Sequence, residues 1–192
     1  MPGRIWLDSE WALLPLLIII PAIVWRERRR GADFRTITLD VAMATYVAAL
    51  IALTFFPLPL PPYDLPAEGF GDFRGWPYPW ISPVPFETIR SSVGLGLEWP
   101  AARYLLGNLV AFAPLGALVP LLRPNWASWR HALLIGLAAS VVIELAQLAM
   151  SLLMGFPFRV ADVDDVILNT LGTILGFASL RMAQRFLRAI RG

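Results

Sequence analysis

The chain has 192 residues, of which 57% are hydrophobic and 16% charged, and its formal net charge is +2. A soluble domain of this composition would expose an extensive apolar surface, so the composition excludes an ordinary soluble domain and predicts an integral membrane protein. The absence of cysteine excludes a disulfide framework, a thiol nucleophile and a thiolate metal site. The small net charge favours membrane topology over nucleic-acid binding.

Five apolar runs follow one another along the chain, and a spanning helix needs roughly 20 such residues. The first run, residues 11–25, is short and contains two prolines, so it predicts a span or a kinked, re-entrant segment. Four later runs are long enough to cross a membrane: residues 39–57, 104–122, 131–153 and 166–187. The sequence therefore predicts an all-α membrane protein, a bundle of about five transmembrane helices that forms a single membrane domain over residues 1–192.

Residues 58–102 are predicted to form a long external loop rich in proline and aromatic residues. The stretches "FPLPLPPYDLP" and "GWPYPWISPVPFETI" place proline too often for a helix or a central strand. Trp76, Tyr78, Trp80 and Phe86 suit the membrane interface, so the loop either anchors there or covers a site. The stretch "SSVGLGLEW" has glycines but neither a lysine nor a predicted helix start after it, which argues against a phosphate-binding loop.

Arginine placement predicts the orientation, because arginine-rich short loops stay on the cytoplasmic side. Five arginines lie within residues 26–35, two within residues 123–130 and four from residue 181 onward. The opposite side of the predicted membrane carries ten of the fourteen acidic residues. We therefore expect the N-terminus outside and the C-terminus in the cytoplasm.

The fourth span carries one stripe of polar and small residues. Ser140, Glu144, Gln147 and Ser151 repeat at helical spacing, and Gly136 extends the stripe. A carboxylate within a span costs on the order of 3 kcal/mol on insertion scales, so Glu144 should face the interior of the bundle.

The third and fifth spans add polar groups at the same predicted depth. In the fifth span Asp165 and Asn169 lie above a seam of Gly172 and Gly176, and Asn108 lies one turn below Arg103 in the third. We expect an outward-facing polar pocket lined by Asn108, Glu144, Gln147 and Asn169, with a rim of Arg103, Arg159, Asp162, Asp164 and Asp165.

Each of these features also has a purely structural interpretation. The spacing of Asp162 and Asp165 fits a helix cap followed by a first-turn acid. Glu144 could serve as a hydrogen-bonding group for Gln147 and Asn169, and the asparagines could join helices. His131, the only histidine, is expected at the cytoplasmic interface, so no histidine-based metal or acid–base site is predicted outside.

Four ordered stretches give the chain a family resemblance: "ISPVPFETI", "GNLVAFAPLGALVP", "IELAQL" and "RVADVDDVILNTLG". Over residues 80–177 it resembles the VanZ-like membrane proteins, a family named for a protein linked to teicoplanin resistance. The resemblance implies a role in the bacterial cell envelope. It also places seven residues on the motif positions of the family: Asn108, Glu144, Gln147, Arg159, Asp162, Asp165 and Asn169.

Three classes of function stay open at this stage. The first is a non-catalytic protein of the bacterial cytoplasmic membrane that binds a lipid-linked envelope precursor or another amphiphile, with an effect on glycopeptide resistance. The second is a membrane hydrolase or transferase, in which Arg159 would hold a phosphate and Asp162, Asp164 and Asp165 would bind Mg²⁺. An activated Ser, Cys or His constellation is absent from the sequence, which ranks the enzyme lower.

The third class is a structural or assembly subunit that binds a protein partner through small-residue helix faces, or a transporter. The inner halves of the predicted helices carry almost no polar groups, which argues against a transport path. Besides the bilayer and these partners, the sequence predicts no nucleic acid and no further cofactor.

Overall fold

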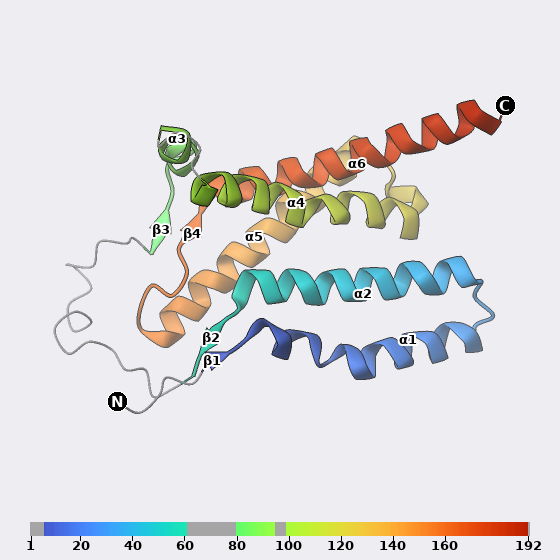
Figure 1. The fold of residues 1–192 in the computed structure, drawn as a ribbon, viewed down its shortest axis with the longest axis horizontal. Helices are drawn as coiled ribbons and strands as arrows, with labels where there is room; N and C mark the ends of the chain where they lie inside the picture. Colours follow the sequence, from blue (N-terminus) through green and yellow to red (C-terminus); the bar gives the residue numbers. More distant parts are fainter. Residues whose placement is uncertain (1–5, 61–79, 95–98, 192) are drawn as a thin grey trace. The chain divides into compact units, whose positions relative to one another are not determined.

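We analysed a computed structural model that describes residues 6–60, 80–94 and 99–191. The described secondary structure is almost entirely helical (Figure 1). The residue contacts divide the chain into two compact units, Met1–Pro77 and Tyr78–Gly192, and each unit is described by itself.

The first unit is a helical hairpin. Its elements are β1 (Trp6–Leu7), the 3-10 helix η1 (Ser9–Leu13), α1 (Leu16–Arg29), α2 (Phe34–Phe55) and β2 (Leu58–Pro59). The two short strands pair antiparallel, with Trp6 opposite Pro59. Gly31 turns the chain between α1 and α2 at a φ of +70°, which glycine adopts without strain. Asp33 begins α2 because its side chain accepts a hydrogen bond from the Thr36 N–H at 3.0 Å.

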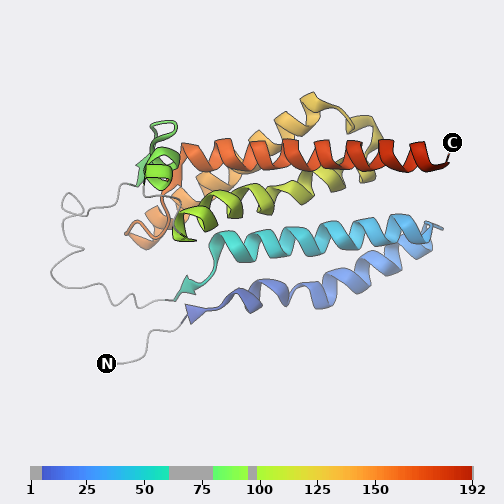
Figure 2. The same cartoon turned by 45° about the horizontal axis from the view of Figure 1, so that its top comes forward.

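The second unit contains three long helices and a short one. Its elements are β3 (Ile81–Ser82), α3 (Glu87–Gly94), α4 (Trp99–Leu122), the 3-10 helix η3 (Pro124–Trp126), α5 (Trp129–Met154), β4 (Ala161–Asp162) and α6 (Val163–Arg191). α6 packs against both α4 and α5 (Figure 2). β3 and β4 pair in parallel, with Ser82 beside Asp162, which ties the segment before α3 to the segment before α6.

Glycines let α6 approach α4 at backbone distance. A Cβ added at Gly176 would lie 1.8 Å from the carbonyl oxygen of Ala113, and one at Gly172 would lie 2.3 Å from that of Leu109. Neither position tolerates a side chain without separation of the helices. The small-residue seam predicted in the fifth span is therefore occupied by α4 of the same unit.

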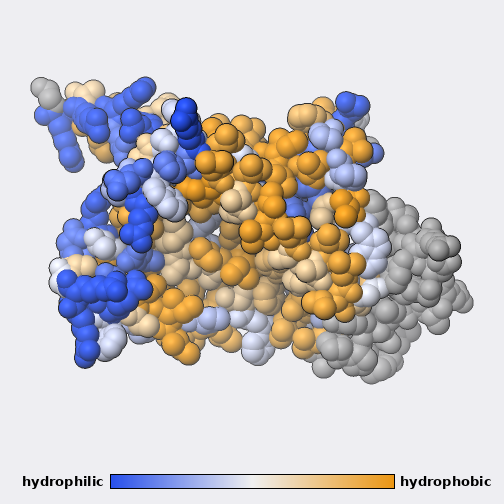
Figure 3. All heavy atoms as spheres, turned by 180° about the vertical axis from the view of Figure 1, so that it is seen from behind, coloured by the Kyte–Doolittle hydropathy of each residue, from blue (hydrophilic) through white to orange (hydrophobic). Residues whose placement is uncertain are grey.

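The outer surfaces of the helices are apolar. Large hydrophobic side chains such as Leu17, Ile18 and Leu153 are 75%, 77% and 88% exposed. Figure 3 shows hydrophobic residues over much of the helical surface on the face drawn, with hydrophilic residues gathered toward the helix ends. Such surfaces suit contact with lipid chains.

Five helical segments among the described residues are long and apolar enough to cross a membrane. They are Ser9–Arg29, Phe34–Phe55, Ala102–Leu122, Trp129–Met154 and Val163–Arg191. The prediction of an all-α protein with about five membrane helices is thus confirmed. The predicted first span, residues 11–25, reaches 21 residues only when η1 is counted together with α1.

The predicted loop of residues 58–102 is partly wrong, because the structure places the helix α3 and the start of α4 within it. Proline is absent from the run "ETIRSSVG" that forms α3, so a helix can propagate there once its first N–H groups find acceptors. A helix also begins at Trp99, the last residue of the glycine-containing stretch for which no helix start was predicted. Trp76 and Tyr78 lie outside the described residues.

Candidate functional site

The start of α6 is capped by Asp162. One carboxylate oxygen of Asp162 accepts a hydrogen bond from the Asp164 N–H at 2.8 Å, the geometry of a helix cap. The other accepts from the Thr88 hydroxyl at 2.6 Å. The structural interpretation of Asp162 as a cap is confirmed, and the same side chain also holds α3.

Asp164 fixes the start of α3. Its side chain is completely buried and accepts hydrogen bonds from the Phe86 N–H at 2.5 Å and the Ile89 N–H at 2.9 Å. These N–H groups lie at the beginning of α3, where the helix itself provides no acceptors. Phe86 has a φ of +67°, an unfavourable conformation for a bulky residue, which these contacts help to maintain. Asp164, predicted at the rim, thus lies inside the structure.

Glu144 joins α5 to the α6 cap. Its Oε2 atom accepts a hydrogen bond from the Asp162 N–H at 2.9 Å, and the residue is buried. The predicted stripe on this helix is confirmed, because Gly136, Ser140, Glu144, Gln147 and Ser151 are all buried.

Asp165 connects α6 to α4. The same oxygen, Oδ1, accepts hydrogen bonds from the Tyr104 hydroxyl and from the Asn108 side-chain amide, the latter at 2.6 Å. Sequence reasoning identified Asn108 but missed Tyr104. The spacing could have identified Tyr104, because it lies four residues before Asn108 and residues four apart on a helix share one face.

Asn169 lies deeper in the unit, between α6 and α5. Its Nδ2 donates to the Ser140 hydroxyl oxygen at 2.9 Å, and both residues are almost fully buried. Among the residues that the structure describes, the Asn169 Oδ1 and Thr170 Oγ1 atoms are buried without a hydrogen-bond partner. An unsatisfied buried polar atom costs about 1–3 kcal/mol, so a native structure keeps one only for a reason.

Arg159 lies in the connection between α5 and β4, which Ser151 holds in place. The Ser151 hydroxyl donates to the Arg159 carbonyl at 2.8 Å and accepts from the Arg159 N–H at 2.9 Å. The guanidinium carbon lies 5.1 Å from the centre of the Phe158 ring. Burial lowers the pKa of Arg159 from its ordinary value, yet an arginine stays charged at neutral pH.

We call Glu144, Asp162, Asp164 and Asp165 the carboxylate cluster. It lies where the beginnings of α3, α4 and α6 meet the second half of α5. Gln147 is buried on the same stripe of α5, whereas Arg103 is exposed on α4. The structure thus links the predicted side chains of three separate helices by hydrogen bonds at one end of the unit.

The carboxylates of this cluster are already engaged by N–H, hydroxyl and amide donors of the protein. Within the described ranges, no three His, Cys, Asp or Glu side chains are arranged to hold a metal ion. The suggested Mg²⁺ site at Asp162, Asp164 and Asp165 fits this arrangement poorly, because five of their six carboxylate oxygens accept hydrogen bonds from the protein.

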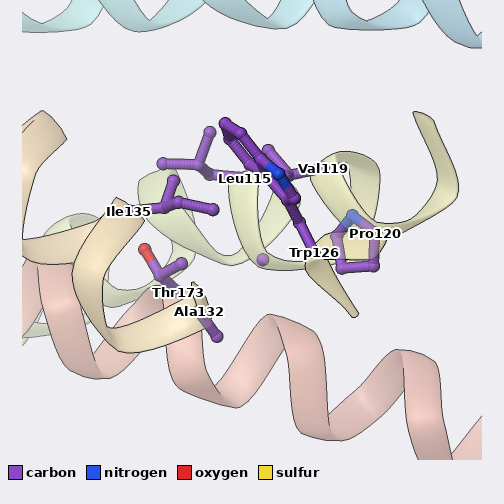
Figure 4. Close-up of a pocket in the computed structure, with 8 residues that line it drawn as sticks. Leu115, Val119, Pro120, Trp126, Ala132, Ile135 and Thr173 are labelled. Carbon is purple, nitrogen blue, oxygen red and sulfur yellow. The ribbon is translucent and has the colours of Figure 1, made fainter. Parts of the chain in front are cut away.

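An apolar hollow lies between the second half of α4, the first half of α5 and the part of α6 around Thr173 (Figure 4). It is too narrow to hold a water molecule and is lined by Leu115, Gly116, Val119, Pro120, Trp126, Ala132, Ile135 and Thr173. The Trp126 ring stacks on His131 at 5.9 Å between ring centres. The hollow has apolar walls, so it is distinct from the predicted polar pocket.

A family model described as VanZ/LLP1 matches residues 43–184. The match begins within α2 and ends within α6, so it contains every residue of the carboxylate cluster. No curated protein and no solved structure matches the chain.

Proposed function

Because the chain belongs to the VanZ/LLP1 family and is a multi-span membrane protein, we propose that it binds the polar head of an amphiphile at the carboxylate cluster. The amphiphile is a lipid-linked precursor of the bacterial cell envelope. The protein alters the handling of this precursor without catalysing a reaction on it, and it thereby affects glycopeptide susceptibility.

The observation that carries this proposal is the unsatisfied amide oxygen of Asn169, which lies one turn into α6 from the carboxylate cluster. It is buried in the interior of the unit, where a polar group without a partner is costly. A hydroxyl or amide group of a ligand would satisfy it. An apolar side chain at this position would have avoided the cost.

Arg159 supplies the opposite charge. It lies in the connection that leads into β4 and Asp162. A lipid phosphate bound by its guanidinium would therefore lie near the cluster. Acidic and basic groups at one end of the unit suit a head that carries a phosphate together with hydroxyl or amide groups.

The placement of the arginines supports the orientation that this proposal requires. The helix ends away from the cluster carry Arg123, Arg130 and the arginines from residue 181 onward, which favours a cytoplasmic position for those ends. The cluster then faces the outside of the bacterial cytoplasmic membrane, where envelope precursors are used. The N-terminus lies outside as well.

The enzyme alternative has less support. A hydrolase or transferase needs a nucleophile or a metal, and the cluster offers carboxylates that are bound to protein donors. Protein-partner binding through the small-residue seams also has less support, because Gly172 and Gly176 pack against α4.

The test uses Arg159→Gln, because the Ser151 contacts hold only the backbone of Arg159 and leave the loop in place. In a glycopeptide-sensitive bacterium, the wild-type chain should change teicoplanin susceptibility and Arg159→Gln should lose most of that change. Arg123→Gln, at the other end of the helices, is the charge-matched control and should act like the wild type. Equal activity of both variants at equal protein levels would overturn the proposal.

A further inference from the structure

The first unit carries a groove that is separate from the carboxylate cluster. It is shallow and open, runs along α1 and has a volume of about 620 Å³. Its lining residues are Ile20, Pro21, Val24, Trp25, Arg28 and Arg29. These positions recur at i, i+1, i+4 and i+5, so they form one continuous face of the helix.

The groove is apolar at one end and cationic at the other. Ile20, Pro21 and Val24 line the first part, and the guanidinium groups of Arg28 and Arg29 lie at the end of α1. Trp25 separates the two parts, and the guanidinium carbon of Arg29 lies 4.0 Å from the centre of the Trp25 ring. This contact holds one cation in position by a cation–π interaction.

The neighbouring charges leave these two arginines available. The carboxylate of Glu27 binds Arg26 at 2.7 Å and Arg30 at 3.2 Å, and Asp40 lies 3.9 Å from Arg26. Within the described part of the chain, neither Arg28 nor Arg29 takes part in an ion pair. The acids of the hairpin thus balance other arginines, and the groove keeps two positive charges for an anion.

The length of the groove favours an anionic phospholipid over a free phosphate. From Arg29 back to Ile20 the helix rises roughly 14 Å, close to one leaflet of a hydrocarbon core about 30 Å thick. A free phosphate would use only the cationic end. An anionic phospholipid would use the whole groove.

We propose that the α1 groove binds an anionic phospholipid, with its phosphate on Arg28 and Arg29 and an acyl chain along Val24 and Ile20. Trp25 lies at the level where the head joins the chains, the usual depth of tryptophan in membranes. The site is independent of the proposed function, because it lies in a different unit and shares no residue with the cluster.

The experiment measures lipid binding to the purified full chain by native mass spectrometry after delipidation. Phosphatidylglycerol and phosphatidylcholine with identical acyl chains are added, and inorganic phosphate is tested as a competitor. The wild type should prefer phosphatidylglycerol, and an excess of phosphate should displace little of it. Complete displacement by phosphate would show an anion site without a lipid groove and would contradict the proposal.

Three variants locate the site. Arg28→Gln with Arg29→Gln should weaken phosphatidylglycerol binding roughly tenfold to thirtyfold, as expected for two arginines at an anionic lipid surface. Arg28→Lys with Arg29→Lys keeps the charge and should retain most of the binding. It also serves as the control that the hairpin folds with both residues replaced. Arg188→Gln with Arg191→Gln removes the same charge from the end of α6 and should bind like the wild type. Equal losses of phosphatidylglycerol binding in both glutamine variants would show that only the net charge matters, and would overturn the proposal.

Discussion

Asp164 accepts a hydrogen bond from the backbone N–H of Phe86, which lies 78 residues earlier in the chain, with 2.5 Å between the two atoms. The buried carboxylate thus serves a helix to which it does not belong. Through this contact the start of α6 holds α3 beside the carboxylate cluster.

Replacement of Asp164 by alanine should release α3. Hydrogen bonds from N–H groups to a carboxylate contribute about 1.5–3 kcal/mol each, so Asp164→Ala should lower the free energy of unfolding by on the order of 3 kcal/mol. Denaturant unfolding in detergent measures the loss of stability, and hydrogen exchange at the Ile89 amide measures the release of α3. Asp8→Ala, at an exposed aspartate without a side-chain cap bond, is the control. Unchanged exchange at Ile89 in Asp164→Ala would contradict the role.

The contact between α4 and α6 should tolerate no side chain at Gly176. An added Cβ would lie 1.8 Å from the Ala113 carbonyl oxygen, so Gly176→Ala should cost at least about 1–3 kcal/mol, the usual range for overpacking. Gly107→Ala is the matched control on α4, because no atom lies within 4 Å of its added Cβ. Thermal unfolding of both variants gives the comparison. A Gly176→Ala protein as stable as Gly107→Ala would show that the helices do not approach this closely.

Glu144 should act as a hydrogen-bond acceptor for the fold, so the shape of the side chain should matter more to stability than its charge. Glu144→Gln keeps an oxygen for the Asp162 N–H, whereas Glu144→Leu leaves that N–H unsatisfied at a cost of about 1–3 kcal/mol. Unfolding experiments should therefore rank the wild type and Glu144→Gln together, above Glu144→Leu. If Glu144→Gln is destabilised as much as Glu144→Leu, the charge itself is required.

The cap of α2 should weaken in acid. Hydrogen bonds from Thr36 hold the pKa of Asp33 below its ordinary value of 3.8. The folded state therefore takes up this proton at a lower pH than the unfolded chain. The stabilisation is complete above the unfolded pKa and is lost as the pH falls through the folded one.

An NMR titration of the Asp33 carboxyl in micelles should give a midpoint below 3.8, with a parallel change at the Thr36 amide. Asp33→Asn keeps an acceptor oxygen without a titrating group, so the Thr36 amide should then stay constant. A midpoint at or above the ordinary value would contradict the cap.

Local periodicity predicted much of this architecture. The spans and the buried stripe through Ser140, Glu144 and Gln147 follow from helical spacing in an apolar sequence, because a bundle buries its few polar groups. The cap at Asp162 follows from its position just before an apolar run.

The pairings between distant segments could not be predicted in the same way. The contact of Tyr104 with Asp165 joins residues 61 apart, and the helix α3 depends on an acceptor from α6. No local pattern encodes such partners. The prolines before α3 indicated a loop. The helix was missed because the acceptor that completes its first turn lies in a remote part of the sequence.

If a lipid-linked precursor places its head at the carboxylate cluster, the amphiphile should copurify with the protein and be identified by its mass. The full chain is purified in mild detergent from its bacterial membrane, together with Arg159→Gln and Arg123→Gln. We predict a specific isoprenoid-linked species on the wild type and on Arg123→Gln, and its loss from Arg159→Gln. Ordinary phospholipid alone, in equal amounts on all three proteins, would show that the cluster does not bind such a precursor.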